Sequence, residues 1–441
     1  MLFRFLKYLQ PTHYFQLFTT TTASVFPVVK SLPESVVKHL TTDTTYLSEL
    51  AQDYDLSWQA IQKGYIGNAS TYTNFEAVSV QDNYHFIRKY FHSAWVFYVL
   101  LLRLMSFKNA IKEVNGWYKT RHISRVQVHS ISLYENDYKD FKSSLLAQHL
   151  KVSVVIPTLN RYDYLKDVLQ DLEQQDYSHF EVIVVDQSDA FDEAFYKSFE
   201  LDIQLIRQTE KALWLARNTA IKAAKGTFIA LSEDDVRIQS DWISSHLKCL
   251  DFFDAQVSAG VFYPEGQHIP KERAFFALAS QFATGNAMLY KDVFKRVGLF
   301  DRQFERQRMG DGEFGMRLYL NDIKSISNPY ASCVDVKAPT GGLRDMGSWD
   351  AFRPSTFFAP RPIPSVLYFF RCYFGNKAAR LAMLRMVPLS IFPYQFKKNK
   401  PLLLLGVFVS LLLLPLVFYQ VFKSWRLASV KIKAGGLIEK L

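Results

Sequence analysis

The stretch KVSVVIPTLNRYDYLKDVLQDLEQQ, residues 151–175, decides the class of fold. A β-branched apolar run at 151–157 is followed by a polar turn at 158–161 and by apolar residues at helical spacing over 164–175. The same unit recurs along the chain. Further strands are predicted at 181–189, 203–208 and 227–235, and a further helix at 212–226, closed by Gly226. Alternating strands and helices, with apolar runs that fill the strands, predict a mixed, mostly parallel α/β sheet with helices on both faces.

Polar and acidic residues follow three of these predicted strands. They occupy 158–161, 186–189 and 233–235. Because ligands of open α/β sheets bind beyond the carboxyl ends of the strands, we expect one site there. Three adjacent carboxylates, Glu233 to Asp235, repel one another, and their oxygens suit Mg²⁺ or Mn²⁺. A solvated acidic turn is the alternative interpretation.

The composition excludes a disordered or fibrous chain, because 49% of the 441 residues are hydrophobic and 21% are charged. The net charge of +10 is concentrated at one end. From Arg361 onward there are 13 Lys and Arg against a single acid, Glu439, which leaves 39 basic and 41 acidic residues elsewhere. The basic character therefore belongs to the C-terminal region.

That region contains an uncharged run of 22 residues, Pro401–Phe422, which is long enough to span a bilayer as one helix kinked at Pro415. A buried core helix is the alternative. Before it, residues 363–394 mix aromatic residues with cations and contain no acid, which suits the lipid headgroup layer. The alternative there is a helix packed on its own domain. We expect a membrane-interface segment at 346–400, a transmembrane helix at 401–422 and a basic tail at 423–441. Membrane lipid is the expected partner of this charge and nucleic acid is not, because the apolar run follows at once.

Residues 1–149 are expected to form a partly helical accessory region. An aromatic-rich apolar run lies near 90–112, but it stops at Arg103 and is too short to span a bilayer. No chemical motif suggests a role for this region.

Beyond these patterns, an ordered series of blocks resembles a known family. The blocks are VSVVIPTLNRYDYLKDVLQDL (152–172), EVIVVDQSD (181–189), LARNTAIKAAKGTFIALSEDD (215–235), TGNAMLYKDVFKRVGLFDRQF (284–304) and GDGEFGMRL (310–318). Together they resemble the inverting family 2 glycosyltransferases of GT-A fold, which implies a GT-A domain at 150–345. The later stretches GGLRDMGSWDAFRP (341–354) and PRPIPSVLYFFRCYFGN (360–376) resemble a bacterial, membrane-associated subset that builds surface polysaccharides or glycolipids.

The resemblance implies a role for each matching residue. It implies donor binding by Pro157, Thr158, Asn160, Arg161, Asp186, Ser188, Arg217 and Asp234. It implies metal binding by Glu233 and Asp235, and by Asp335, which stands where many relatives have His. It implies acceptor or sugar binding by Gly285, Asn286, Arg308, Glu313 and Arg317. Asp311 matches the catalytic base, with Gly310 in place of the usual preceding Glu. An acid that merely stabilises a helix N-terminus is the alternative for Asp311.

These roles lead to an expected function. A divalent cation would stabilise the departing diphosphate while Asp311 accepts the proton of an acceptor hydroxyl. The expected enzyme moves a sugar, with inversion, from a nucleotide-diphosphate sugar to a lipid-linked or membrane-proximal glycan. We expect it to be anchored in a bacterial inner membrane, with its catalytic domain facing the cytoplasm. The alternative is a catalytically inactive relative that serves as a binding or assembly subunit.

Overall fold

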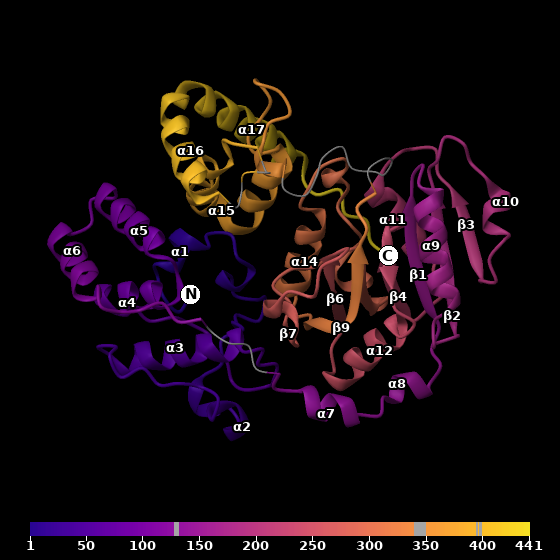
Figure 1. The fold of residues 1–441 in the computed structure, drawn as a ribbon, viewed down its shortest axis with the longest axis horizontal. Coiled ribbons are helices and arrows are strands. Elements are labelled where there is room, and N and C mark those ends of the chain that lie inside the picture. The colour runs from indigo at the N-terminus through magenta and orange to yellow at the C-terminus, as the bar shows by residue number, and fades with distance from the viewer. Residues whose placement is uncertain (128–131, 339–349, 394–395, 397–398) are drawn as a thin grey trace.

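Four parallel strands form the part of the sheet that the sequence predicts. Figure 1 shows the computed structural model, which describes residues 1–127, 132–338, 350–393, 396 and 399–441. The strands are β1 (Val152–Thr158), β2 (Phe180–Asp186), β3 (Ile203–Arg207) and β4 (Phe228–Ser232), and they lie in the order β3-β2-β1-β4. Thr158 and Asp186 are paired in the register of β1 and β2, so both residues lie at the carboxyl end of the sheet.

Beyond β4 the sheet becomes mixed. The order continues β4-β8-β6-β9-β5, with β8 antiparallel to β4 and β6 parallel to β9. These strands are β5 (Val236–Ile238), β6 (Val257–Pro264), β8 (Asn286–Tyr290) and β9 (Ser325–Asp335), while β7 (Ala277–Leu278) pairs with β9. The predicted strand at 227–235 ends earlier, at Ser232, so the three acids lie in the connection between β4 and β5.

Helices cover both faces of the sheet, as predicted. Alternate residues of β1 point to opposite sides, as in any strand. Val154 belongs to the core beneath α9 (Tyr162–Glu173) and α12 (Trp242–Phe252). Val155 belongs to the core beneath α11 (Leu213–Ala223) and α14 (Gly310–Leu320). The short helices α10 (Glu193–Tyr196) and α13 (Asp292–Val297) complete this domain.

Gly226 does not close α11 as predicted, because the helix ends at Ala223 with Ala224 as its cap. The reason for a glycine lies in the sheet. A Cβ at position 226 would lie 2.7 Å from both the backbone oxygen of Lys151 and the backbone nitrogen of Ser153. The glycine therefore allows the turn into β4 to approach the start of β1.

The N-terminal region is helical and packs against the sheet domain. Its helices are α1 (Leu6–Leu9), α2 (Glu34–Val37), α3 (Glu49–Gln62), α4 (Val80–Tyr90), α5 (Ser93–Met105), α6 (Ala110–Lys119), α7 (Glu135–Asp140) and α8 (Ser144–Ala147). The Tyr319 hydroxyl of α14 donates to the Leu17 carbonyl oxygen at 2.7 Å, and Ser143 donates to Asp251 of α12 at 2.7 Å. These contacts join the two regions.

The C-terminal region differs from its prediction in two ways. The apolar side chains of α15 (Pro364–Met386), among them Leu367 and Phe370, are buried in the same core as α14, so the structure favours the packed-helix interpretation of this helix over the membrane-interface one. The expected single helix at 401–422 is instead two helices, α16 (Lys400–Leu412) and α17 (Leu414–Ala434), bent by 87°. Pro415 lies in the first turn of α17, where its missing N–H has no helical partner to lose.

Within the described ranges, no single helix is both long enough and apolar enough to cross a bilayer. The bent pair of α16 and α17 meets the two criteria when its helices are taken together. The block at 341–349, with the expected domain boundary at 345, lies outside the described residues. After α17 the chain returns to the sheet domain. There the Leu299 N–H donates to the Glu439 carbonyl oxygen at 2.8 Å, and the Leu437 N–H donates to the Asp301 carboxylate at 2.9 Å.

Candidate active site

Side chains from β1 and from the β4–β5 connection meet at the predicted edge. The Thr158 hydroxyl donates to Asp234 at 2.8 Å. The Arg161 guanidinium donates through Nη1 to Asp234 and to Asp235, at 3.0 Å each. Thr158, Arg161, Asp234 and Asp235 therefore form one cluster.

The acids of this cluster carry concentrated negative charge. Burial, together with repulsion from Glu233 and Asp234, raises the pKa of Asp235 to about 6, and burial raises the pKa of Asp234. Arg161 opposes both shifts. A bound cation would relieve the part of these shifts that comes from repulsion between the neighbouring carboxylates.

Asp186 is held by side chains that the sequence did not single out. The hydroxyls of Tyr162 and Tyr196 donate to its Oδ2 at 2.6 and 2.8 Å, and the Ser188 N–H donates to Oδ1 at 2.8 Å. Both tyrosines were visible in the sequence, but only the fold shows that they converge. Asp186 is thereby fixed in orientation at the end of β2.

The loops after β1 and β2 are joined to one another beside Asp186. The Asn160 N–H donates to the Ser188 hydroxyl at 2.8 Å, with Asn160 in a left-handed conformation at φ 54°. Pro157 is buried in β1 opposite Val185. A recess of about 340 Å³ opens here, lined by residues 160–164 and Ala190. Asn160 and Arg161 are the predicted donor residues that line this recess.

Glu233 and Arg217 connect the acid cluster to α11. Arg217 is fully buried, its Nη1 donates to the Thr284 carbonyl oxygen at 2.5 Å, and its Nη2 lies 3.7 Å from Glu233 Oε1. A Cβ on Gly285 would lie 2.7 Å from the Glu233 carboxyl carbon, so the glycine leaves room for that side chain. Asp335 lies at the end of β9, opposite Val236 in the register.

Asp311 lies in the first turn of α14, half-exposed, where the helix dipole favours a carboxylate. Met309 before it adopts a left-handed conformation, with φ 81°. A Cβ on Gly310 would overlap the ring of Trp214 on α11. The N-terminus of α14 therefore packs directly on α11 at Trp214, which lies three residues before Arg217. This packing explains the absence of the usual Glu at position 310.

Glu313 and Arg317 anchor α14. Arg317 donates to Glu313 at 2.7 and 2.9 Å and to the carbonyl oxygens of Val297 and Leu299. Burial raises the pKa of Glu313. Both charged groups are thus paired inside the protein, and their contact with an acceptor stays a prediction.

Asn286 is likewise a core residue. Its side chain is fully buried, its Oδ1 accepts from Trp242 Nε1 at 2.8 Å, and its Nδ2 donates to the Ala331 carbonyl oxygen at 2.8 Å. An indole N–H is only a donor, which fixes the amide orientation and makes His246 Nε2, 3.1 Å from Oδ1, a donor too. No polar group of Asn286 is left for the predicted acceptor contact.

This arrangement predicts a pH-dependent stability. Burial lowers the pKa of His246 from 6.5 to about 4, so the unfolded chain binds a proton between those values while the folded chain does not. The free energy of unfolding is expected to fall as pH drops from 6.5 to 4, by about 3 kcal/mol for this group. Urea unfolding at each pH measures it. His246→Gln is expected to flatten this dependence, whereas the exposed His268→Gln keeps it; equal slopes for both variants would contradict the assignment.

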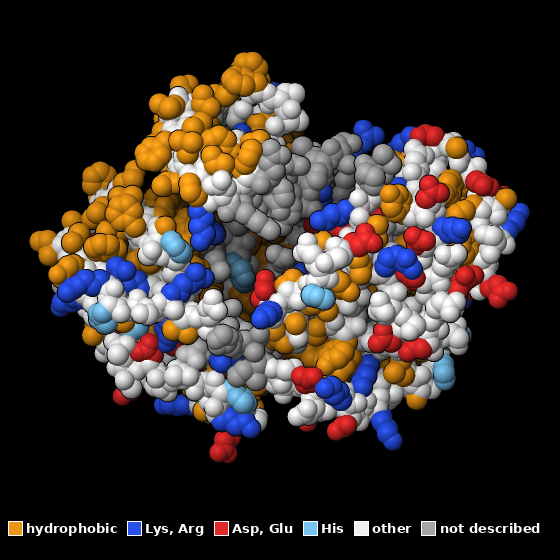
Figure 2. Space-filling model, viewed as in Figure 1, with side chains coloured by type: hydrophobic (Ala, Val, Ile, Leu, Met, Phe, Trp, Pro, Cys, Tyr) orange, Lys and Arg blue, Asp and Glu red, His pale blue; other side chains and the backbone are white. Residues whose placement is uncertain are grey.

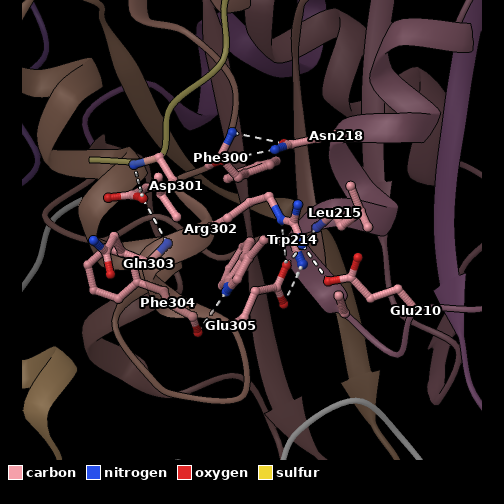
Figure 3. A network of polar contacts seen from close by, with 12 residues as sticks. Glu210, Trp214, Leu215, Asn218, Phe300, Asp301, Arg302, Gln303, Phe304 and Glu305 are labelled. Atoms are coloured by element: carbon pink, nitrogen blue, oxygen red, sulfur yellow. Dashed lines mark hydrogen bonds and ion pairs between the residues drawn. The ribbon is translucent and has the colours of Figure 1, made fainter. Parts of the chain in front are cut away.

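The segment before α14 is fixed by polar contacts (Figure 3). Glu305 accepts from the N–H groups of Trp214 and Leu215 at 3.2 and 2.8 Å, and Trp214 Nε1 donates to the Phe304 carbonyl oxygen at 3.1 Å. Arg302 donates to Glu210 at 2.5 Å. Trp214 is thus a core residue, and Glu305 was not predicted. Arg308, a predicted acceptor contact, is half-buried in the same segment.

The acid cluster has the chemistry of a divalent-cation site. Carboxylate oxygens are the ligands that Mg²⁺ and Mn²⁺ prefer, and Glu233 and Asp335 both lie near enough to Cys333 to help burial raise its pKa. In the chain as described, however, no three Asp, Glu, His or Cys side chains converge on one coordination geometry. Arg161 supplies the positive charge for two of the acids. The donor set fits a hard cation in type.

The structure is an α/β protein whose mixed sheet has polar and acidic side chains at the carboxyl ends of its parallel strands. The comparisons with known proteins point to a family. Residues 153–300 match the model for "Glycosyl transferase family 2", so this part of the chain is similar to that glycosyltransferase family.

Curated relatives are similar over part of this chain. Glycosyltransferase GlyA of Streptococcus pneumoniae is 26% identical over 163 residues, which are 36% of this chain and 22% of GlyA. The hyaluronan synthase of Pasteurella multocida is 26% identical over 223 residues, 39% of this chain and 23% of that enzyme. The chain thus spans less than a quarter of the length of these two relatives.

One solved structure, Staphylococcus aureus TarS residues 1–349 with UDP-GlcNAc, is 17% identical, covers 65% of this chain and 92% of that one, and has a TM-score of 0.40.

Proposed function

We propose that this protein transfers a sugar, with inversion, from a nucleotide-diphosphate sugar to a hydroxyl group of a lipid-linked or membrane-proximal glycan. The observation that supports the proposal is the cluster of Thr158, Arg161, Asp234 and Asp235 at the carboxyl ends of strands in the part of the chain that is similar to glycosyl transferase family 2. One of the relatives named above is a glycosyltransferase and the other is a hyaluronan synthase.

Each part of the site has a role in this reaction. Thr158 and Asp186 hold the nucleoside, and Asp311 accepts the proton of the attacking hydroxyl. Glu233, Asp235 and Asp335 would hold a divalent cation, which stabilises the charge of the departing diphosphate. Arg161 keeps the acids ionised and in place before the donor binds. Glu313 and Arg317 fix the helix that carries Asp311.

The membrane context is part of the same proposal. Because sugar nucleotides are made in the cytosol, we place the sheet domain on the cytoplasmic side of a bacterial inner membrane. The apolar pair α16–α17 attaches the protein there and raises the effective concentration of a membrane-bound acceptor.

A second function is favoured by one observation. Arg161 already pairs with Asp234 and Asp235, as expected if the chain needed no cation. The second function is that of an inactive relative that binds or assembles with glycan-synthesis proteins.

A donor screen separates the two. The purified chain is heated with UDP-, GDP- or dTDP-sugars, each with and without Mn²⁺. We expect one nucleotide sugar with Mn²⁺ to raise the unfolding midpoint by several degrees, since a ligand at 100 times its Kd stabilises by about 2.7 kcal/mol. Hydrolysis of that donor then identifies an active enzyme. No shift with any donor contradicts the proposed function, whereas binding without hydrolysis or transfer favours the second.

A further inference from the structure

The exposed large apolar side chains are unevenly distributed over the described residues. From 150 to 338, Tyr330 is the one such side chain in the sheet domain. The N-terminal region, in contrast, exposes a group of them on the hairpin of α5 and α6, which we call the α5–α6 tip (residues 97–118). Phe107 is 97% exposed and Ile111 is 82% exposed. The group also includes Phe97, Leu101, Met105 and Val114.

The α5–α6 tip lies on the same side of the molecule as α16–α17. Figure 1 shows the α5–α6 tip and the α16–α17 pair on the side away from β1–β3, and Figure 2 shows apolar side chains over both. On α16–α17 the most exposed of these are Leu412, at 82%, and Phe418, at 70%. The tip and the α16–α17 pair therefore expose apolar surface on the same side of the molecule.

Helix α15 connects the α5–α6 tip to the α16–α17 pair. The Arg385 guanidinium of α15 lies 5.0 Å from the centre of the Trp95 ring of α5, and it donates to the Leu9 carbonyl oxygen of α1. Helix α15 in turn packs along α17, where Arg371 donates to Ser429 at 2.8 Å. A surface that binds the α16–α17 pair thus also lies close to the α5–α6 tip.

The exposed charged side chains of the tip, and of the residues directly after it, are all positive. Lys108, Lys112, Lys119 and Arg121 are exposed. The single acid between residues 93 and 127, Glu113, is buried, where it pairs with Arg103 and accepts from Tyr84. Apolar side chains ringed by cations suit a surface of anionic phospholipid. Helix α5, with 13 residues, is too short to span the bilayer.

We propose that the α5–α6 tip is a second lipid-binding element, which inserts into the headgroup layer of an anionic bilayer beside α16–α17. This gives the N-terminal region a role that its sequence did not suggest. Phe107, Ile111 and Met105 enter the apolar layer, and the four cations contact lipid phosphates. The inference rests on the membrane attachment proposed above for α16–α17 but not on sugar transfer.

A site-specific probe tests the proposal in the full chain, because α16–α17 alone could hold the protein on vesicles. Exposed Cys372 is changed to Ser, and an environment-sensitive fluorophore is attached at Phe107→Cys or, as the control, at Leu47→Cys, which is 63% exposed in the same region. The vesicles contain phosphatidylglycerol and nitroxide-labelled acyl chains. We expect quenching at 107 and none at 47. An unquenched label at 107 on vesicle-bound protein, or no vesicle binding at all, overturns the proposal.

A second measurement uses side-chain removal. The triple variant Met105→Ser, Phe107→Ser, Ile111→Ser is expected to lower partition onto these vesicles at least tenfold, since each large apolar side chain favours lipid by about that factor. Val37→Ser with Leu47→Ser is the matched control and should leave partition unchanged. Lys108→Glu with Lys112→Glu should weaken binding to anionic vesicles more than to neutral ones.

Other outcomes of these measurements are also decisive. Equal partition of the triple variant and its control overturns the proposal, as does a label at 107 that responds to protein concentration but not to lipid, which indicates a second copy of the chain. Unfolding midpoints verify that the variants fold. The donor screen is run without lipid, so failure of this inference and failure of the proposed function are separate results.

Discussion

Asp311→Asn is expected to lower the rate of sugar transfer by roughly 10²–10⁴-fold, the usual contribution of a positioned general base. The amide keeps the shape of the carboxylate, and the Gly312 N–H that now donates to Asp311 at 2.8 Å still finds an oxygen. Donor binding is expected to change little, because the proposed nucleoside contacts come from Thr158 and Asp186, at the ends of β1 and β2. Single-turnover transfer and thermal-shift titration measure the two effects separately.

The control for this variant addresses the alternative reading of Asp311. Asp292 is an acid in the first turn of α13 and is exposed. If Asp311 only stabilised a helix N-terminus, Asp311→Asn and the control Asp292→Asn would each cost about 0.3–1 kcal/mol of stability and leave transfer intact. Normal turnover by Asp311→Asn removes it as the base.

Asp235→Asn is the second change with a large expected effect. It removes one charge from the acid cluster and the Arg161–Asp235 ion pair, while the Arg161–Asp234 pair remains. Since a cation at the departing diphosphate supplies several kcal/mol, we expect transfer to fall by roughly 10²–10⁴-fold. Treating the unmodified protein with EDTA should have a similar effect, reversed by adding Mn²⁺.

Two measurements distinguish loss of the cation from loss of the fold. The midpoint for Mn²⁺ activation should rise in Asp235→Asn, while the unfolding midpoint without Mn²⁺ should stay level or increase, because a repelled carboxylate has been removed. Asp202→Asn, at the far end of the sheet near Lys151, is the control. Full activity in EDTA would show that Arg161, rather than a cation, neutralises the acids during the reaction.

Much of the site was predictable because its residues follow strands. Periodicity identified β1, β2 and β4, and the rule that ligands lie at strand ends then selected Thr158, Asp186 and the acids. The strands from β5 to β9 were missed, since their partners lie far apart in the sequence and their apolar runs are short.

Side-chain pairings were the part that the sequence did not reveal. Arg161 reaches across to Asp234 and Asp235, 73 and 74 positions away, and no local pattern encodes such a distance. Asn286 and Arg317 were assigned to the acceptor from motif position, yet burial commits them to the core. The run at 401–422 satisfied the length rule, but the break before Pro415 divides it into two helices.

The return of the chain after α17 bears on how this protein is to be handled in the laboratory. Removing α16–α17 and everything after them, in order to work without detergent, would also take away Leu437 and Glu439, which bond to Asp301 and Leu299. Leu299 and Asp301 lie at the start of the segment that leads to Asp311. A trimmed, detergent-free version is therefore expected to lose support just where the proposed base is held, and its inactivity would say little about the intact enzyme.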